Sequence, residues 1–246
     1  PDYMADLTSG HNIIASVLVQ ARGFYRANGP QVLYPVGETD HAAQVARQAE
    51  LDGGPALCAA IVGHADLMLG AAVRPVLEAH VAAGQGRFRG IRHILAWDSD
   101  TRLLNPAYRT SEDMMDSPAF IAGFAELWHM GLTFDAWLHF HQIPRLTALA
   151  RRFPHIPIVL NHCGGVLGAG AYDRDQTFAA WRSAIADLAT CPNVMVKVGG
   201  LGMALSNFGF DHLDRPPSSK MLAQAWGKWV ETCISTFGPS RVMFES

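Results

Sequence analysis

The sequence predicts an α/β fold, specifically a (β/α)8 barrel that lacks its first strand and its last helix. Short apolar runs alternate with helical patterns along the chain, which is typical of a parallel sheet. Apolar residues make up 49% of the 246 residues and charged residues only 17%. This balance suits strands that are buried on both faces of a sheet. The chain ends directly after its last apolar run, with no helix to cover it.

The expected strands are apolar runs too short to form helices. They cover residues 13–20, 56–62, 88–96, 132–139, 156–162, 194–198 and 241–245. Apolar residues at helical spacing predict helices between several of these strands, for example over residues 146–153, 178–188 and 222–237. A doubly wound sheet of seven strands is the alternative arrangement of the same elements.

No low-complexity linker divides the chain, so residues 1–246 are expected to form a single barrel domain that is truncated at both ends. The connections from helix to strand are short. Two connections from strand to helix are long, over residues 97–116 and 201–218. Long loops on one face of a barrel mark the face that binds substrate.

Composition excludes several classes of partner. The net charge is −3 and no basic stripe is present, which argues against nucleic-acid binding. No apolar run approaches the roughly 18 residues of a membrane span. The four cysteines are scattered without CxxC spacing, which argues against a disulfide scaffold and favours a reducing cytoplasm. We therefore expect a cytoplasmic protein with a small-molecule partner, and its oligomeric state stays open.

His162 is the leading candidate for a catalytic residue. It follows the apolar run of residues 156–161 and precedes Gly164 and Gly165. This is the pattern of a buried parallel strand that delivers a polar group at its carboxyl end, where α/β enzymes collect their chemistry.

The ends of two other expected strands carry candidate substrate-binding residues. Arg92 and His93 lie in an apolar stretch, where a permanent charge is costly without a partner. Arg92 could bind a substrate carboxylate or a polarised carbonyl, or it could form an ion pair in the barrel interior. Tyr25 and Arg26 follow the first expected strand and could assist in binding an anionic group.

Two histidines at the end of the fourth expected strand are candidate metal ligands. His139 and His141 are two residues apart, so on a strand both would point to one face. Neutral imidazole is a common ligand of zinc and similar ions. Asp135, on the same strand, could orient a histidine or cap a turn. Six other histidines fall in helical or loop patterns and are expected mostly at the surface: His11, His41, His80, His129, His155 and His212.

The ordered set of motifs resembles the amidohydrolase superfamily, and within it the family 2 branch of barrel hydrolases, which includes lactonases. The motifs are FRGIRH, FDAWLHFHQ, IVLNHCGG, NVMVKVGGLGM and RVMFES. The resemblance implies that His162 is the sixth-strand histidine, that Arg92 binds substrate, and that His139 or His141 is a metal ligand. It also implies a His-x-His pair on a missing first strand and an aspartate at or beyond Ser246.

The resemblance implies hydrolysis of a small lactone or related ester, with His162 and Asp135 as catalytic residues. Members of this branch differ in their use of metal, so a single divalent ion such as zinc is one alternative and metal-free hydrolysis is the other. A zinc-dependent decarboxylase on the same barrel and a barrel that only binds a ligand are the competing functions.

Overall fold

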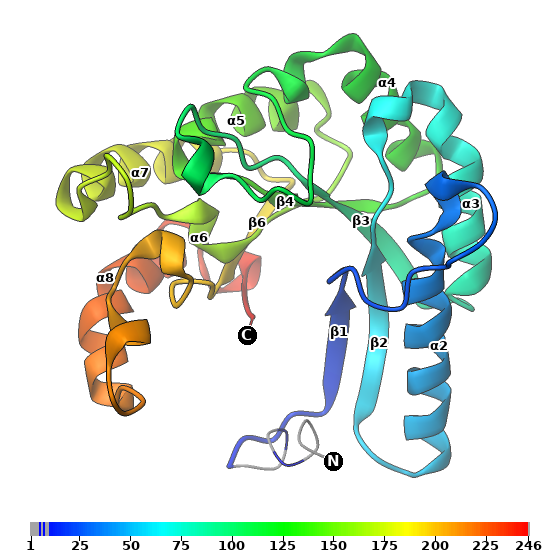
Figure 1. Ribbon diagram of the computed structural model, residues 1–246, viewed down its shortest axis with the longest axis horizontal. Coiled ribbons are helices and arrows are strands. Elements are labelled where there is room, and N and C mark those ends of the chain that lie inside the picture. Colours follow the sequence, from blue (N-terminus) through cyan, green and yellow to red (C-terminus); the bar gives the residue numbers. More distant parts are fainter. Residues whose placement is uncertain (1–4, 6, 8–9, 246) are drawn as a thin grey trace.

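Seven parallel strands form one curled sheet in which each strand pairs with the next one along the chain (Figure 1). The computed structural model describes residues 5, 7 and 10–245. The strands are β1 (Ala15–Val19), β2 (Ala56–Gly63), β3 (Phe88–Ile94), β4 (Thr133–Trp137), β5 (Ile158–Leu160), β6 (Val194–Val198) and β7 (Val242–Phe244). The α/β prediction is confirmed. A doubly wound sheet would reverse its strand order at a switch point, so that alternative is wrong.

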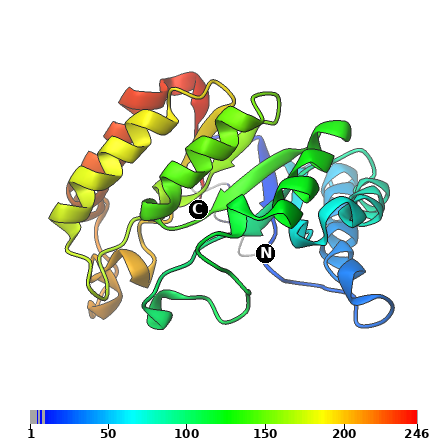
Figure 2. The same ribbon diagram turned by 90° about the horizontal axis from the view of Figure 1, so that it is seen from above.

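Helices connect successive strands and cover the outer face of the sheet (Figure 2). The helical segments are α2 (Val36–Leu51), α3 (Arg74–Ala83), α4 (Pro118–His129), α5 (Ile143–Arg152), α6 (His162–Gly165), α7 (Arg174–Leu188) and α8 (Ser219–Phe237). Of these, α6 is a single turn with left-handed backbone angles. Short 3-10 turns lie in the connections: η1 (Gln31–Leu33), η2 (Leu67–Val73), η3 (Thr101–Leu103), η4 (Met114–Asp116), η5 (Phe140–Gln142), η6 (Ala204–Ser206), η7 (Phe210–His212) and η8 (Pro239–Arg241). None of the helices in the described part of the chain is long and apolar enough to span a bilayer.

Polar side chains fix where several helices begin. The Ser117 hydroxyl accepts the backbone N–H of Phe120 at the start of α4, and the next residue is a proline. Asp173 accepts two backbone N–H groups at the start of α7, and Ser218 caps α8 in the same way. These side chains satisfy donors that the first helical turn leaves free. They therefore fix the points at which the loops on the carboxyl side of the sheet end.

The core lies between the sheet and the helices and is rich in aromatic side chains. Trp181 of α7 and Trp229 of α8 are fully buried, with ring centroids 4.7 Å apart and planes inclined by 65°. Phe124 of α4 packs edge-on against Phe134 of β4 at 5.0 Å. All four cysteines are free and buried. This core holds the strands in register, so that Arg92 of β3 lies beside Asp135 of β4.

The sheet has two edge strands, and the curl brings β1 and the carboxyl-terminal end to the same side of the molecule (Figures 1 and 2). Both edges expose apolar side chains: Val17 of β1 is 57% exposed and Phe244 of β7 is 79% exposed. The architecture is a curled half-barrel. The predicted absence of a first strand and a last helix stays a prediction.

The prediction that His139 and His141 share one face of a strand is wrong. Strand β4 ends at Trp137, and His141 lies in the turn η5. The Gln142 side chain ends the strand, because its Oε1 accepts the backbone N–H groups of Trp97 and His139 while its Nε2 donates to the carbonyl of Leu95. The chain therefore turns into α5 two residues earlier than the apolar pattern indicates.

His80 does not lie at the surface. It is fully buried in α3, where its Nδ1 lies 2.8 Å from the Thr39 hydroxyl and its Nε2 lies 3.0 Å from the carbonyl of His64. Its ring stacks on Phe88 at 4.9 Å. Burial lowers the pKa of His80 to about 4, so the imidazole is neutral in the folded protein.

Candidate active site

His162 begins a left-handed turn directly after β5. The φ angles of residues 162 to 165 are 55°, 49°, 76° and 64°. Two glycines complete this turn at little cost, and at Gly165 a Cβ would lie 1.8 Å from the carbonyl oxygen of Leu138. The indole N–H of Trp181 holds the turn by donating to the carbonyl of Cys163 at 2.7 Å. The two non-glycine residues are thus kept in a conformation that L-residues rarely adopt, which is common at functional sites.

Glu245 contacts His162 at two points with one oxygen. Its Oε1 accepts the backbone N–H of His162 at 2.6 Å and lies 2.7 Å from the Nδ1 of the same residue. Both side chains are largely buried, with exposed fractions of 20% for His162 and 14% for Glu245. The carboxylate therefore fixes the backbone of His162 through a hydrogen bond and lies beside Nδ1 of its ring, to which it makes no hydrogen bond.

The double glycine after β6 makes room for this pair. A Cβ on Gly199 would lie 2.5 Å from Cγ of Glu245, and a Cβ on Gly200 would lie 2.5 to 2.7 Å from three atoms of His162. The backbone of β6 can approach the pair only because neither residue has a side chain. The carboxyl ends of β5, β6 and β7 therefore meet at His162.

Asp135 lies in a buried ion pair beside this group. Lys197 of β6 donates its Nζ to Asp135 Oδ2 at 2.5 Å, and Asn161 donates its Nδ2 to the same oxygen at 2.9 Å. Asp135 is 1% exposed and Lys197 is 7% exposed. Asn161 immediately precedes His162, so Asp135 acts on the position of His162 through its neighbour.

Arg92 lies at the carboxyl end of β3 and is held by Gln20, which follows β1. Its Nε donates to Gln20 Oε1 at 3.4 Å, and a terminal nitrogen donates to the Gln20 carbonyl. Burial lowers the pKa of the Arg92 guanidinium, and the nearby carboxylates of Asp135, Glu245 and Glu38 act in the opposite direction. The influence of Glu245 on Arg92 is electrostatic, and the two side chains form no ion pair with each other.

Gln20 also contacts two tyrosines. Its Nε2 donates to the hydroxyl of Tyr108 at 2.9 Å and to that of Tyr25 at 3.2 Å. Burial raises the pKa of Tyr25 to about 12, which keeps its hydroxyl protonated. Tyr108 belongs to the long loop of residues 97–116. Gln20 therefore joins this loop to β1 and to Arg92.

Two predicted substrate-binding residues, His93 and Arg26, have other partners than Arg92, Gln20 and the tyrosines. His93 is buried among apolar neighbours, with its ring 5.6 Å from that of Phe120, and its Nδ1 accepts the backbone N–H of Leu67. Burial lowers the pKa of His93 to about 3. Arg26 instead forms an ion pair with Asp40 at 2.6 Å, with both side chains about two-fifths exposed.

His139 and His141 have separate partners. The His139 ring is fully buried, with its Nε2 3.3 Å from the carbonyl of Leu103 and its Nδ1 without a hydrogen-bond partner. The Nε2 of His141 lies 3.0 Å from Asp98 Oδ2, which also accepts the Tyr172 hydroxyl at 2.5 Å. The two imidazole centroids are 6.0 Å apart.

These residues do not fit a metal centre. Among residues 5, 7 and 10–245, no group of three or more His, Cys, Asp or Glu side chains is arranged to hold an ion. Nδ1 of His139 has no partner among the described residues, but Nε2 of His141 is already engaged with Asp98. A zinc site with protein ligands uses three or four of them.

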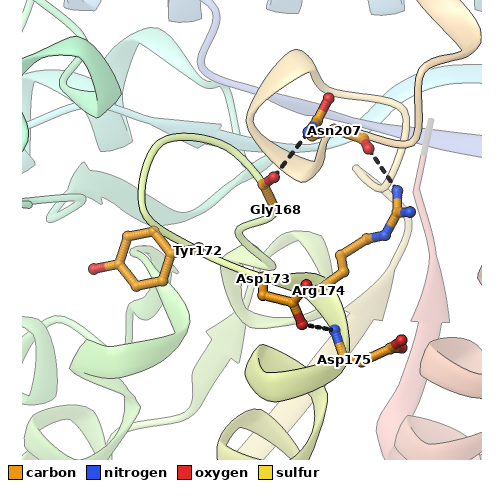
Figure 3. Close-up of a pocket in the computed structure, with 6 residues that line it drawn as sticks. All are labelled: Gly168, Tyr172, Asp173, Arg174, Asp175 and Asn207. Atoms are coloured by element: carbon orange, nitrogen blue, oxygen red, sulfur yellow. Dashed lines mark hydrogen bonds between the residues drawn. The ribbon is translucent and has the colours of Figure 1, made fainter.

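Two cavities lie apart from His162 and Arg92. One of about 200 Å³ is lined by Gly168, Tyr172, Asp173, Arg174, Asp175 and Asn207, between the loops that follow β5 and β6 (Figure 3). In it, the Arg174 guanidinium donates to the Asn207 carbonyl, and Asn207 donates to the carbonyl of Gly168 (Figure 3). The other, of about 450 Å³, lies between β1 and α2 and is lined mainly by apolar side chains.

Sequence reasoning missed Gln20 and Tyr108, and it noted Glu245 and Asp98 at strand ends without assigning them a role. Glu245, Gln20, Tyr108 and Asp98 each lie within a few residues of the end of a strand or in a long loop. Glu245 was detectable, because it is a carboxylate directly after the last apolar strand. Gln20 and Tyr108 carry no such signal, because neither their residue type nor their position in the sequence distinguishes them.

The model of the amidohydrolase family matches residues 20–246 of this chain. The protein y4mH of Sinorhizobium fredii is 31% identical over 245 residues, which are 100% of this chain and 70% of that protein. The L-fucono-1,5-lactonase of Burkholderia multivorans is 29% identical over 248 residues, with the same coverage of 100% and 70%.

Solved structures show the same fold. An amidohydrolase from Burkholderia multivorans with bound zinc is 27% identical and superposes with a TM-score of 0.66, covering 100% of this chain and 72% of that one. Amidohydrolase 2 from Bifidobacterium longum subsp. infantis is 19% identical with a TM-score of 0.53, covering 100% and 70%. The similarity to the Bifidobacterium structure shows a shared fold and nothing more.

Proposed function

This chain belongs to the amidohydrolase family, and from that premise we propose that it hydrolyses the ester bond of a small lactone. The family and the lactonase among its relatives support a hydrolase with a small-molecule substrate. The single observation that carries the proposal is the contact between Glu245 Oε1 and His162 Nδ1 at 2.7 Å. An imidazole oriented by a carboxylate is the usual arrangement of a general base in ester hydrolysis.

His162 moves the proton in the proposed reaction. In this step Glu245 Oε1 faces Nδ1 of His162 and stabilises the positive charge that the ring gains, while Nε2 accepts a proton from water. The water oxygen bonds to the carbonyl carbon of the lactone and forms a tetrahedral intermediate. The ring C–O bond then breaks, and Nε2 returns its proton to the departing alkoxide. The product is the open-chain hydroxy acid, and all atoms of water and lactone are accounted for.

Arg92 and Asp135 support this step in different ways. Arg92 supplies positive charge for the carbonyl oxygen, which becomes negative as water adds, or for an anionic group of the substrate. Asp135 accepts from Asn161 and Lys197, so it holds the backbone next to His162 and is a positioning residue. The predicted anionic character of the substrate stays a prediction.

The proposed step passes through no metal ion. The related Burkholderia amidohydrolase binds zinc. The described residues of this chain offer no set of three ligands, so the chemistry is assigned to His162, Glu245 and Arg92. Because the four cysteines are free thiols, we place the reaction in a reducing compartment such as the cytoplasm.

The proposal is tested by replacing His162 with asparagine and assaying a panel of aldonolactones. Loss of a general base costs about 10²- to 10⁴-fold in rate, so kcat/KM of the H162N protein should fall by at least about 10²-fold. His212→Asn is the matched control, because the His212 side chain is 80% exposed. Unchanged kcat/KM in H162N on an accepted lactone removes His162 from the chemistry. Absence of turnover of every lactone by the unmodified protein refutes the proposed reaction.

A further inference from the structure

Two phenol groups beside Arg92 have hydroxyl protons that no group in the described part of the chain accepts. Gln20 Nε2 has two protons, and it donates one to Tyr25 and one to Tyr108. Both phenol oxygens therefore act as acceptors. Within residues 10–245, neither hydroxyl donates to another side chain or carbonyl. Each O–H remains free to donate to a third group.

The orientation of the Gln20 amide is fixed from its other end. Arg92 donates its Nε to Gln20 Oε1, so the amide nitrogen must face the tyrosines. Gln20 is fully buried, which holds the amide in place. Both tyrosines are only partly buried. A buried amide thus presents two phenols whose O–H groups can reach a ligand.

Tyr108 brings the long loop of residues 97–116 into this arrangement. The Arg22 guanidinium lies 5.2 Å from the centre of the Tyr108 ring and donates to the carbonyl of Ala107 at 2.6 Å. The ring of His64, which follows β2, packs edge-on against the Tyr108 ring, with 6.2 Å between the ring centroids. The backbone and ring of Tyr108 are therefore both anchored, although the residue lies far from any strand in sequence.

We infer that Tyr25 and Tyr108, aligned by Gln20, form a subsite that binds hydroxyl groups of a polyhydroxylated lactone, and that Tyr108 determines this specificity. The inference rests on the proposed function, which it extends by naming the class of substrate. Two aligned O–H donors beside a guanidinium suit a ligand rich in oxygen acceptors. Sugar-derived lactones carry such acceptors around the ring, whereas an unsubstituted lactone offers only its ester oxygens.

The experiment compares two lactones with the same six-membered ring. Gluconolactone carries hydroxyl groups, and δ-valerolactone carries none. Their hydrolysis is measured with the unmodified protein, Y108F and Y25F. Tyr34→Phe is the matched control, because Tyr34 is also partly buried and its hydroxyl is not one of the two that Gln20 contacts.

Loss of one neutral hydrogen bond should raise KM for gluconolactone about tenfold in Y108F, with kcat within about twofold. The value of kcat/KM for δ-valerolactone should stay within about twofold in the same variant. An equal loss on both lactones, or an unchanged KM for gluconolactone, overturns the inference. Because both lactones are assayed with the same preparation of each variant, a loss of folded protein lowers both rates equally and cancels in their ratio.

Binding of gluconolactam, a stable analogue that the enzyme cannot open by ester hydrolysis, separates this inference from the proposed function. Isothermal calorimetry should show about tenfold weaker binding to Y108F than to Y34F. This result without any lactone turnover supports the subsite and refutes the proposed reaction. Lactone turnover together with equal lactam binding by the two variants refutes the subsite and leaves the reaction standing. No binding of the lactam by the unmodified protein also refutes the subsite.

Discussion

Replacement of Gly200 by alanine should reduce catalysis far more than it reduces stability. Gly200 has a φ of +70°, and a Cβ there would lie 2.5 Å from Cβ, 2.6 Å from Nδ1 and 2.7 Å from Cγ of His162. Ordinary van der Waals contact begins at 3.4 Å, so the imidazole or the β6 backbone must shift by about 1 Å. A displacement of that size at a reacting group can cost about 10²-fold in rate. We therefore expect kcat/KM of G200A to fall about 10²-fold, or about 2.7 kcal/mol.

Gly131→Ala is the matched control for this variant. Gly131 has a φ of +63°, and a Cβ there meets nothing within 4 Å. Both variants incur the left-handed backbone penalty of about 1–2 kcal/mol, which lowers Tm by about 2–8 °C in a chain of this size. Only G200A also displaces His162. Lactone assays and thermal unfolding of both proteins are the measurements. If G200A and G131A keep the same kcat/KM, the ring of His162 is not positioned by Gly200 and the argument fails.

Three further predictions concern stability and metal use. First, burial lowers the pKa of His80 to about 4 and that of His93 to about 3, whereas both titrate near 6.5 when unfolded. The unfolded chain therefore binds protons first, and these two residues together should lower the free energy of unfolding by up to about 2.7 kcal/mol per pH unit between pH 6.5 and 4. Urea denaturation should show a slope about 1.4 kcal/mol per unit shallower in His80→Gln, and an unchanged slope refutes the assignment. Second, Arg241 donates to four backbone carbonyls, those of Ala189, Cys191, Val194 and Phe237. Arg241→Met should therefore lower the free energy of unfolding by about 2–4 kcal/mol in denaturant titrations. The control Arg102→Met, at an exposed arginine, should change the free energy of unfolding by less than about 0.5 kcal/mol. Third, chelation with EDTA should leave kcat/KM unchanged if the proposed proton transfer by His162 carries the reaction; activity lost on chelation and restored by zinc would contradict that proposal.

The sequence was most informative about buried strands. A parallel strand that is covered on both faces must be a short apolar run, and the polar residue that ends it is easy to see. Arg92, Asp135 and His162 were found in this way, and the register of the sheet places the first two side by side. The boundaries were less certain, because an apolar run can continue past the point where hydrogen bonding to the next strand stops. This is why His139 and His141 were assigned to a strand that ends at Trp137.

The partners of these residues were harder to predict, since they come from distant segments. Gln20 and Arg92 are separated by 72 positions, and His162 and Glu245 by 83. Only the curl of the sheet brings them together. The left-handed turn at His162 has a partial signal in Gly164 and Gly165, but its continuation into His162 itself depends on Trp181, Gly200 and Glu245. Interactions of this kind follow from the packing of the whole sheet.

The surroundings of Arg92 bear on which part of a substrate it binds. Three carboxylates act on its charge, Asp135 from β4, Glu245 after β7 and Glu38 from α2, and burial opposes its ionisation. Asp135 is also paired with Lys197, so two buried cations face three carboxylates before a ligand arrives. A substrate carboxylate would add a fourth negative charge to this group and would have to compete with buried carboxylates that cannot move away. The negative charge on a carbonyl oxygen develops only as water adds, when His162 has taken up a proton, so the net charge of the site does not change. Arg92 is thus better suited to the carbonyl oxygen of an uncharged lactone than to a carboxylate, which agrees with a site whose remaining donors are the hydroxyls of Tyr25 and Tyr108.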